Sequence, residues 1–244
     1  MKNKKILLWG LLIVSILSIS LFIGTNQKEQ KTPIIDKVII DEPTKEEITG
    51  IDINKIKNDY QNEDIIGYIV IPEVVSYPVL QKDNNNYYLN HDINNNQNIK
   101  GSIFMDYRVS FNDRKILIYG HSGKEQDLPF LQLNKYSEES FFQENNIIYL
   151  YSVDKIYTYE IFSSYVETAD FDYVNINSFN GLTWFEHLLK LKEKSNYQTD
   201  VALTKNSKVL ILQTCSMNQE IQSSGGKYQL IIGKLTATQE NKYQ

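Results

Sequence analysis

The 244-residue sequence is poor in cysteine and in arginine. Cys215 is its only cysteine, so no disulfide can form within the chain. Arg108 and Arg114 are its only arginines, and no basic patch interleaved with aromatic residues accompanies them, which disfavours nucleic-acid binding. No group of Cys, His and Asp residues has the spacing of metal ligands. We therefore expect no metal, no other cofactor and no nucleic-acid partner.

The N-terminus holds a long stretch without charge. Residues 6–27 carry no charged side chain, their apolar part runs to about Ile23, and Lys2, Lys4 and Lys5 precede them. A membrane crossing needs roughly 20 predominantly apolar residues, and a basic flank stays in the cytoplasm. Residues 1–27 are thus predicted to form a cytoplasmic tip and a single-pass transmembrane helix. The alternative, a cleaved signal peptide, would have a shorter apolar region that ends at an Ala-x-Ala-like site.

The remainder of the chain is acidic. Residues 1–27 hold three of the 25 basic residues and none of the 30 acidic ones, so the remainder has a formal net charge of −8. Residues 28–47 are rich in Lys, Glu, Thr, Pro and Asp without a sustained period, which predicts an extracellular stalk. The residues beyond are numerous enough to build a hydrophobic core without disulfides. We expect a folded domain over 48–238 and a C-terminal tail over 239–244.

Short apolar runs separated by turn residues predict that this domain is mostly β. Each run is rich in β-branched and aromatic residues. Many short strands of this kind are typical of a barrel or a sandwich. The predicted strands are 65–71, 74–80, 114–120, 147–151, 156–166, 201–204, 209–214 and 228–235.

Three helical regions interrupt the strands. Residues 48–60 have apolar side chains at roughly helical spacing, and one or two short helices are predicted over 128–133 and 137–142. A third helix, 182–191, has the capping-box pair Thr183 and Glu186. Its predicted apolar face consists of Leu182, Phe185, Leu188, Leu189 and Lys192. This helix lies in a connection of more than 30 residues, which is either a substrate wall or an insertion without function.

His121 and Cys215 each end a predicted strand, so both can be presented at the rim of one sheet. A thiol becomes a useful nucleophile when a nearby imidazole stabilises its thiolate, and the same imidazole can protonate a leaving amine. The alternative is that Cys215 is a small buried hydrophobic residue, as most free cysteines are. Of the other histidines, His187 is predicted on the polar, solvated side of its helix. His91 is either a hydrogen-bonding residue of a loop or part of a groove.

The chain resembles a known family at these positions. Ile211-Leu-Gln-Thr-Cys215 resembles the Thr-Leu-x-Thr-Cys signature of sortases, with Ile211 in place of the first Thr. Further segments between Asp64 and Leu235 resemble class B sortases in the same order and at compatible spacing. These segments are Ile66-Gly-Tyr-Ile-Val-Ile-Pro72, Tyr77-Pro-Val-Leu-Gln81, Tyr87-Tyr-Leu-Asn-His-Asp92, Gly101-Ser-Ile-Phe-Met-Asp-Tyr-Arg108 and Ile118-Tyr-Gly-His121.

The resemblance implies a fold, an activity and a location. The fold would be an eight-stranded sortase-type β-barrel with an N-terminal helix and a helix in the long loop before the last strands. The activity would be that of a membrane-anchored cysteine transpeptidase, with its catalytic domain outside a Gram-positive cell. Cys215 would attack the Thr carbonyl of a C-terminal sorting signal, of the Asn-Pro-x-Thr type, on a surface protein. An amine of a peptidoglycan precursor or a pilin would then resolve the thioacyl intermediate, with His121 as acid and base.

One family residue has no counterpart. Sortases place an arginine at the start of the strand after the cysteine loop, where it supports the substrate and the oxyanion. Here Tyr228 stands at that position, beside Lys227, and neither supplies a planar bidentate fork. Losing one oxyanion donor typically costs about 2.7 to 4 kcal/mol. The alternative is therefore a sortase-like surface binding module with weak or lost turnover, and a carbohydrate-binding β-domain is a third hypothesis. Predicted substrate-groove residues are Tyr119, Asn90 and Gln213.

Overall fold

The structure, a computed structural model, describes residues 48–123, 128–168, 171–215 and 228–243. The predicted stalk and transmembrane anchor lie outside these residues. Within them, no helix has both the length and the apolar character needed to cross a membrane. The described residues belong to one compact unit that begins at Glu47.

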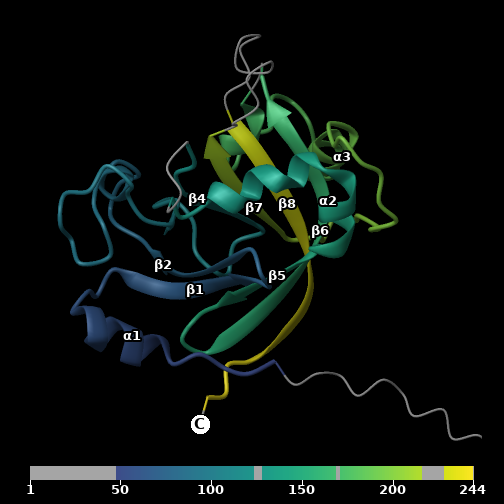
Figure 1. Cartoon of the computed structure of the whole chain (residues 1–244). Helices are drawn as coiled ribbons and strands as arrows, with labels where there is room; N and C mark the ends of the chain where they lie inside the picture. The colour runs from purple at the N-terminus through teal and green to yellow at the C-terminus, as the bar shows by residue number, and fades with distance from the viewer. Residues whose placement is uncertain (1–47, 124–127, 169–170, 216–227, 244) are drawn as a thin grey trace, which may run out of the picture. The chain divides into compact units, whose positions relative to one another are not determined.

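This unit is a closed β-barrel (Figure 1). Of the two predicted architectures, a barrel and a sandwich, the first is therefore confirmed. The strands follow one another around the barrel in the order β1, β2, β3, β4, β7, β8, β6, β5. Pairing is antiparallel except for β2 with β3 and β4 with β7, which are parallel. The strands are β1 (Ile65–Ile71), β2 (Val75–Leu80), β3 (Phe104–Met105), β4 (Lys115–Tyr119), β5 (Ile147–Tyr151), β6 (Lys155–Glu167), β7 (Val209–Cys215) and β8 (Tyr228–Glu240).

Two of these strands, β4 and β7, are buried on both faces. Alternate side chains such as Ile116 and Leu210 belong to the cluster that fills the barrel. The side chains between them, such as Leu117 and Ile211, belong to a second cluster outside the barrel wall, together with the helix α3 (Trp184–Glu193). Successive residues of a strand point to opposite faces, so both clusters rest on one pair of strands. This double burial explains the continuous aliphatic runs in the sequence.

The shorter helices lie near their predicted positions. The helix α1 (Ile53–Tyr60) begins five residues later than predicted, where the carboxylate of Asp52 accepts a hydrogen bond from Lys55 N at 2.9 Å. The predicted pair over 128–142 is a 3₁₀ helix η2 (Leu131–Ser137) followed by α2 (Glu139–Glu144). Two further 3₁₀ turns are η1 (Tyr87–Leu89) and η3 (Asp172–Val174).

The capping box that was predicted to start α3 is confirmed, but of its predicted apolar face only Leu188 is buried. The Thr183 hydroxyl accepts from Glu186 N, and the Glu186 carboxylate accepts from Thr183 N. The buried residues are Trp184, His187, Leu188 and Leu191. Phe185 and Leu189 are 37% and 44% exposed, so the helix is rotated relative to the prediction. The buried face carries polar groups because neighbouring segments supply partners for them: the Trp184 indole donates to the carbonyl oxygen of Ser207, which precedes β7, at 3.0 Å.

Two strand predictions need correction. Residues 201–204 form no strand: Val201 packs in the cluster under α3, and its carbonyl accepts a hydrogen bond from Lys192 Nζ. The last strand continues past residue 235 to Glu240. The Asn241 side chain that follows is buried and bonds to the main chain of Ile51, which joins the two ends of the described domain.

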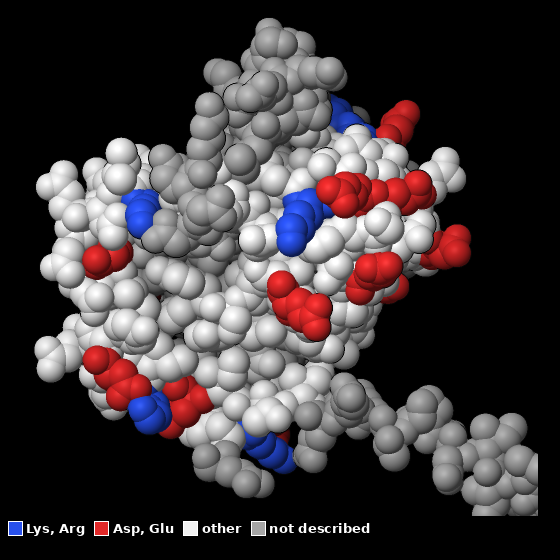
Figure 2. Space-filling model, in the orientation of Figure 1, with Lys and Arg blue, Asp and Glu red and all other residues white. Residues whose placement is uncertain are grey.

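Charge on the surface is mixed but predominantly acidic on the face shown in Figure 2. Glu138, Glu139 and Glu144 are exposed in and beside α2. The excess of acidic side chains agrees with the acidic composition.

Candidate active site

The parallel pairing of β4 with β7 determines which chain segments meet. Tyr119 lies opposite Gln213, and Gly120 N donates a hydrogen bond to Gln213 O at 3.2 Å. Parallel strands end at the same edge of a sheet. The main chain of His121, two residues after the end of β4, and that of Cys215, the last residue of β7, are therefore at the same end of the barrel. Across β7, Cys215 pairs with Tyr228, the first residue of β8.

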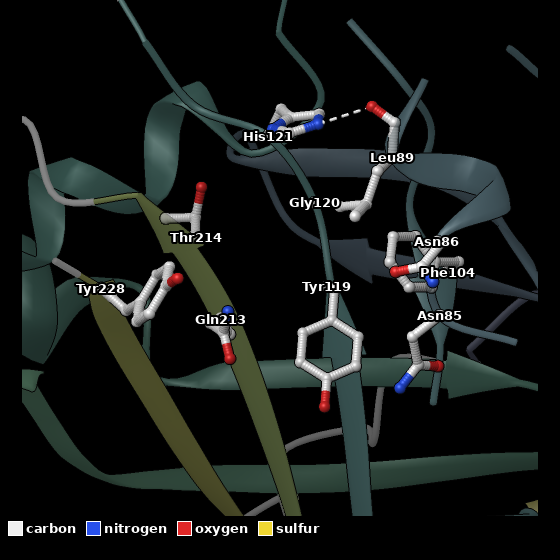
Figure 3. Close-up of a pocket in the computed structure, with 10 residues that line it drawn as sticks. All are labelled: Asn85, Asn86, Leu89, Phe104, Tyr119, Gly120, His121, Gln213, Thr214 and Tyr228. Atoms are coloured by element: carbon white, nitrogen blue, oxygen red, sulfur yellow. Dashed lines mark hydrogen bonds between the residues drawn. The ribbon is translucent and has the colours of Figure 1, made fainter. Parts of the chain in front are cut away.

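A pocket of about 320 Å³ opens at these strand ends (Figure 3). Its volume is at the lower end of the range for small-ligand sites. Much of its lining is apolar or aromatic. The lining residues are Asn85, Asn86, Leu89, Phe104, Tyr119, Gly120, His121, Gln213, Thr214 and Tyr228.

His121 is partly exposed in this pocket and is oriented by the 3₁₀ turn η1. Its Nε2 lies 2.7 Å from the carbonyl oxygen of Leu89, the last residue of that turn. A carbonyl can only accept, so Nε2 carries the hydrogen and Nδ1 is the nitrogen that is free to bind a proton. Gly101 allows this close approach: its φ is +58°, and a Cβ there would lie 3.0 Å from His121 Cδ2 and 2.5 Å from Tyr88 O.

The side chain of Tyr119 lines the pocket, and its hydroxyl is hydrogen-bonded to a buried carboxylate. The hydroxyl donates to the carboxylate of Asp106 at 2.8 Å. Burial, together with the charge of Asp106, raises the pKa of Tyr119 well above its ordinary value. Tyr119 therefore stays protonated and keeps this hydrogen bond at all physiological pH values.

The opposite wall is formed by β7 and β8. The Tyr173 hydroxyl donates to Gln213 Oε1 at 2.8 Å, and Phe171 packs edge-on against the Tyr228 ring at 5.9 Å between centroids. Within the described part of the chain, the buried Thr214 hydroxyl has no hydrogen-bond partner. A buried polar group without a partner costs free energy.

The pocket is lined by four of the predicted site residues: His121, Tyr119, Gln213 and Tyr228. A fifth predicted residue that the structure describes, Asn90, does not line it. Asn90 is exposed at the end of η1, next to Leu89, and is not among the lining residues. Lys227 and the side chain of Cys215 lie outside what the structure describes.

Sequence reasoning missed six of the ten lining residues. These six are Asn85, Asn86, Leu89, Phe104, Gly120 and Thr214. Leu89, Phe104, Gly120 and Thr214 lie in segments quoted for the family resemblance, which was the available signal, whereas Asn85 and Asn86 had none.

The other two histidines lie outside this lining. His91 Nδ1 lies 2.8 Å from Tyr87 O and its ring stacks on Tyr87, which matches the prediction of a hydrogen-bonding loop residue. The prediction for His187 was wrong: it is 1% exposed, and its Nε2 lies 3.0 Å from Lys115 Nζ. The reason is the rotation of α3 described above, which turns His187 toward β4.

Comparison with known proteins agrees with this geometry. The Sortase domain family matches residues 69–233. Sortase B of Listeria monocytogenes is 34% identical over 178 residues, which cover 71% of this chain and 70% of that protein. Sortase B of Staphylococcus aureus is 30% identical over 177 residues, which cover 71% of each chain. The structure of Clostridium perfringens sortase B superposes with a TM-score of 0.67 at 28% identity, over 75% of this chain and 99% of that chain. The chain therefore belongs to the sortase family of cysteine transpeptidases, and these relatives are class B enzymes.

Proposed function

We propose that this sortase cleaves a C-terminal sorting signal of the Asn-Pro-x-Thr type after Thr and transfers the protein to an amine. Cys215 is the nucleophile and His121 is the acid and base. The observation that supports this assignment best is the parallel pairing of β4 with β7, which brings the main chains of these two residues to one end of the barrel beside the pocket. A nucleophile and its base must lie close together. This pairing brings together the main chains of two residues that are 94 positions apart in sequence.

In the first half-reaction the thiolate sulfur of Cys215 bonds to the Thr carbonyl carbon and the C–N bond to the next residue breaks. The leaving nitrogen takes a proton from His121. In the second half-reaction an acceptor amine attacks the thioester, gives a proton to His121, and the thiolate leaves. The bond between His121 Nε2 and Leu89 O favours both steps, because it fixes the ring and leaves Nδ1 to carry the moving proton.

Tyr228 takes over part of the role of the absent arginine. It faces Cys215 across the β7–β8 ladder and lines the pocket, so its phenol can donate one hydrogen bond to the substrate or the oxyanion. Lys227, the preceding residue in sequence, also carries a positive charge but lies outside the described residues. One neutral donor is weaker than a charged bidentate fork, so we expect turnover to be slower than in a sortase with the arginine. The absent arginine also favours the second candidate, a sortase-like binding module that holds the signal without cleaving it.

Two solved relatives support the choice of substrates: a Staphylococcus aureus sortase B–substrate complex and a sortase B complexed with triglycine. For this chain we propose surface proteins as donors and a peptidoglycan or pilin amine as acceptor. Tyr119, Gln213 and Asn90 line or flank the groove for the signal. Residues 1–27 anchor the enzyme in the cell membrane by a single pass, with the catalytic domain outside.

The test is to incubate the purified chain with an Asn-Pro-x-Thr peptide and triglycine. Intact mass spectrometry should detect a thioacyl adduct on Cys215, and chromatography should detect the ligated peptide. Neither product should form with Cys215→Ala. If the wild type binds the peptide but gives no adduct with excess peptide, the binding module is the correct function.

A further inference from the structure

Asp106, next to β3, is a fully buried carboxylate that gathers hydrogen-bond donors from several segments. It is 0% exposed. Its Oδ1 accepts from Arg108 N and Arg108 Nε, both at 2.9 Å. Its Oδ2 accepts from Arg108 Nη2 at 2.7 Å, from Tyr119 Oη at 2.8 Å and from Asn85 Nδ2 at 3.0 Å. A carboxylate has about four lone-pair sites, so these five donors fill its capacity.

Two of these donors belong to the pocket wall. Tyr119 lies on β4, and Asn85 lies in the loop between β2 and η1. Figure 3 shows the phenol oxygen of Tyr119 and the amide nitrogen of Asn85 directed to the same side of the pocket. The other end of the Asn85 amide is also engaged, because Asn85 Oδ1 accepts from Tyr107 N at 3.0 Å. Hydrogen bonds to residues outside the pocket lining thus hold the side chains of Tyr119 and Asn85 in place.

Arg108 extends the connection to the remaining wall. Its Nη2 also donates to the carbonyl of Val174 in η3, at 3.1 Å. The residue before Val174, Tyr173, donates to Gln213 on β7. Asp106 is therefore connected to three sides of the pocket: directly to the loop before η1 and to strand β4, and through Arg108 and the adjacent residues Tyr173 and Val174 to η3 and β7.

The charge of Asp106 is required for this arrangement. Burial on its own would raise the pKa of Asp106, but the hydrogen bonds from Arg108, Tyr119 and Asn85 outweigh it and the pKa is lowered. The ionised carboxylate presents only acceptors to its partners. The amide of an Asp106→Asn variant would direct an NH₂ group at one side of this donor set, which leaves donors unpaired.

We propose that Asp106 is a positioning residue for the sorting signal: it holds the Asn85 and Tyr119 wall, and through Arg108 the η3 wall, at the separation that the bound peptide requires. This inference rests on the proposed function of the pocket. Asp106 does not touch the reacting atoms, so its loss should weaken peptide binding far more than it slows the chemical step. Side chains that are no longer held in position must be ordered when the peptide binds, and that cost appears as a higher KM and Kd.

The experiment compares Asp106→Asn with Asn241→Ala. Asn241 is a matched control because its side chain also makes several buried hydrogen bonds, to the main chains of Ile51, Ser152 and Val153, and it is not among the pocket-lining residues. Both variants should lower the melting temperature. Only Asp106→Asn should raise KM for the signal peptide, by about 10- to 100-fold with kcat changed less than about threefold. Alkylation of Cys215 by iodoacetamide should keep its wild-type pH profile.

A second variant covers the case in which Asp106→Asn does not fold. Arg108→Lys keeps the charge but loses the fork, and Arg108 is not among the lining residues, so a rise in KM must come from displaced walls. An unchanged KM in Arg108→Lys, or an equal rise in Asn241→Ala, would overturn the proposal. Fluorescence anisotropy of a labelled signal peptide measures Kd directly, and Kd should rise in the same variants as KM. If the wild type gives no adduct, the proposed turnover fails alone, and the Kd values still decide the role of Asp106.

Discussion

The outer face of the β4–β7 wall has two halves that differ in what covers them. In the covered half, Leu117 and Ile211 are buried beneath α3. In the open half, Tyr119 and Gln213 line the pocket. Each lies two residues after Leu117 or Ile211 on the same strand, so its side chain is on the same face of the sheet. The strands are continuous between the halves. The difference therefore comes from the 168–208 connection, whose helix covers one half and leaves the other accessible.

The two halves also differ in how their polar groups are used. In the covered half Lys115 Nζ donates to Asn175 O at 2.8 Å and contacts His187, so the buried charge is enclosed by protein partners. In the open half the side chains of Tyr119 and Gln213 also have hydrogen-bond partners, Asp106 and Tyr173, but they still line the pocket. The same sheet thus provides stability in one half and binding capacity in the other.

The largest expected effect comes from removing the histidine of the open half. His121→Ala should lower kcat/KM for signal transfer by about 10²- to 10⁴-fold, because it removes the residue that we propose as acid and base of both half-reactions. Its stability should change little, since the ring is partly exposed. His187→Ala is the contrasting variant: it should lower the free energy of unfolding and leave kcat near wild type. If His187→Ala lost activity as His121→Ala does, without unfolding, the division between the halves would be wrong.

The next effect concerns the packing of the covered half. Leu188→Ala should lower the free energy of unfolding by about 2 to 5 kcal/mol, because Leu188 is completely buried between α3 and the barrel. Leu189→Ala is the matched control, since the neighbouring side chain is 44% exposed and should change stability by less than about 0.5 kcal/mol. Urea denaturation of both variants measures the difference. Equal losses of stability would show that Leu189 is buried as deeply as Leu188, which would contradict this orientation of α3.

A smaller effect, dependent on pH, tests the buried charge of the covered half. Burial, together with the charge of Arg108, lowers the pKa of Lys115 to about 7. In the unfolded chain this lysine keeps its proton up to its ordinary pKa near 10.5. The unfolded state binds more protons between these values, so stability rises with pH in that interval, by at most about 1.4 kcal/mol per pH unit. Between pH 7.5 and 9.5 this rise should be present in the wild type and reduced in Lys115→Met; parallel curves would contradict it.

The sequence predicted the strands well where the signal was local. Strands β1 and β5 have the predicted bounds, because each is a β-branched and aromatic run enclosed by turn residues. The capping box of α3 was also visible locally. The buried face of α3 was not, because it depends on partners far away in sequence: Lys115 for His187, and Ser207 for Trp184. An apolar run such as 201–204 can pack without pairing, so its strand prediction failed.

The site was predictable in part for the same reason. His121 follows a recognisable strand and Cys215 ends another, so their position at strand ends could be inferred from sequence. Phe104 and Asn85 reach the pocket only because β3 pairs in parallel with β2 and because Asp106 binds Asn85. Neither contact leaves a local pattern. The role of Asp106 could be seen only once the four segments around it were placed together.

The smallest effect concerns Tyr228, at the edge of the open half. Tyr228→Phe removes the neutral hydrogen bond that we propose between its phenol and the substrate or oxyanion, which would be worth about 0.5 to 1.5 kcal/mol. The value of kcat/KM should therefore fall about 3- to 10-fold, while the packing of the ring on Phe171 is kept. Tyr228→Arg should instead raise kcat/KM, because a charged fork binds a carbonyl oxygen more strongly than a phenol does. Phe171→Leu is the control for packing alone and should leave kcat unchanged. If Tyr228→Phe were as active as wild type and Tyr228→Arg were not faster, the oxyanion would have to be supported by another donor.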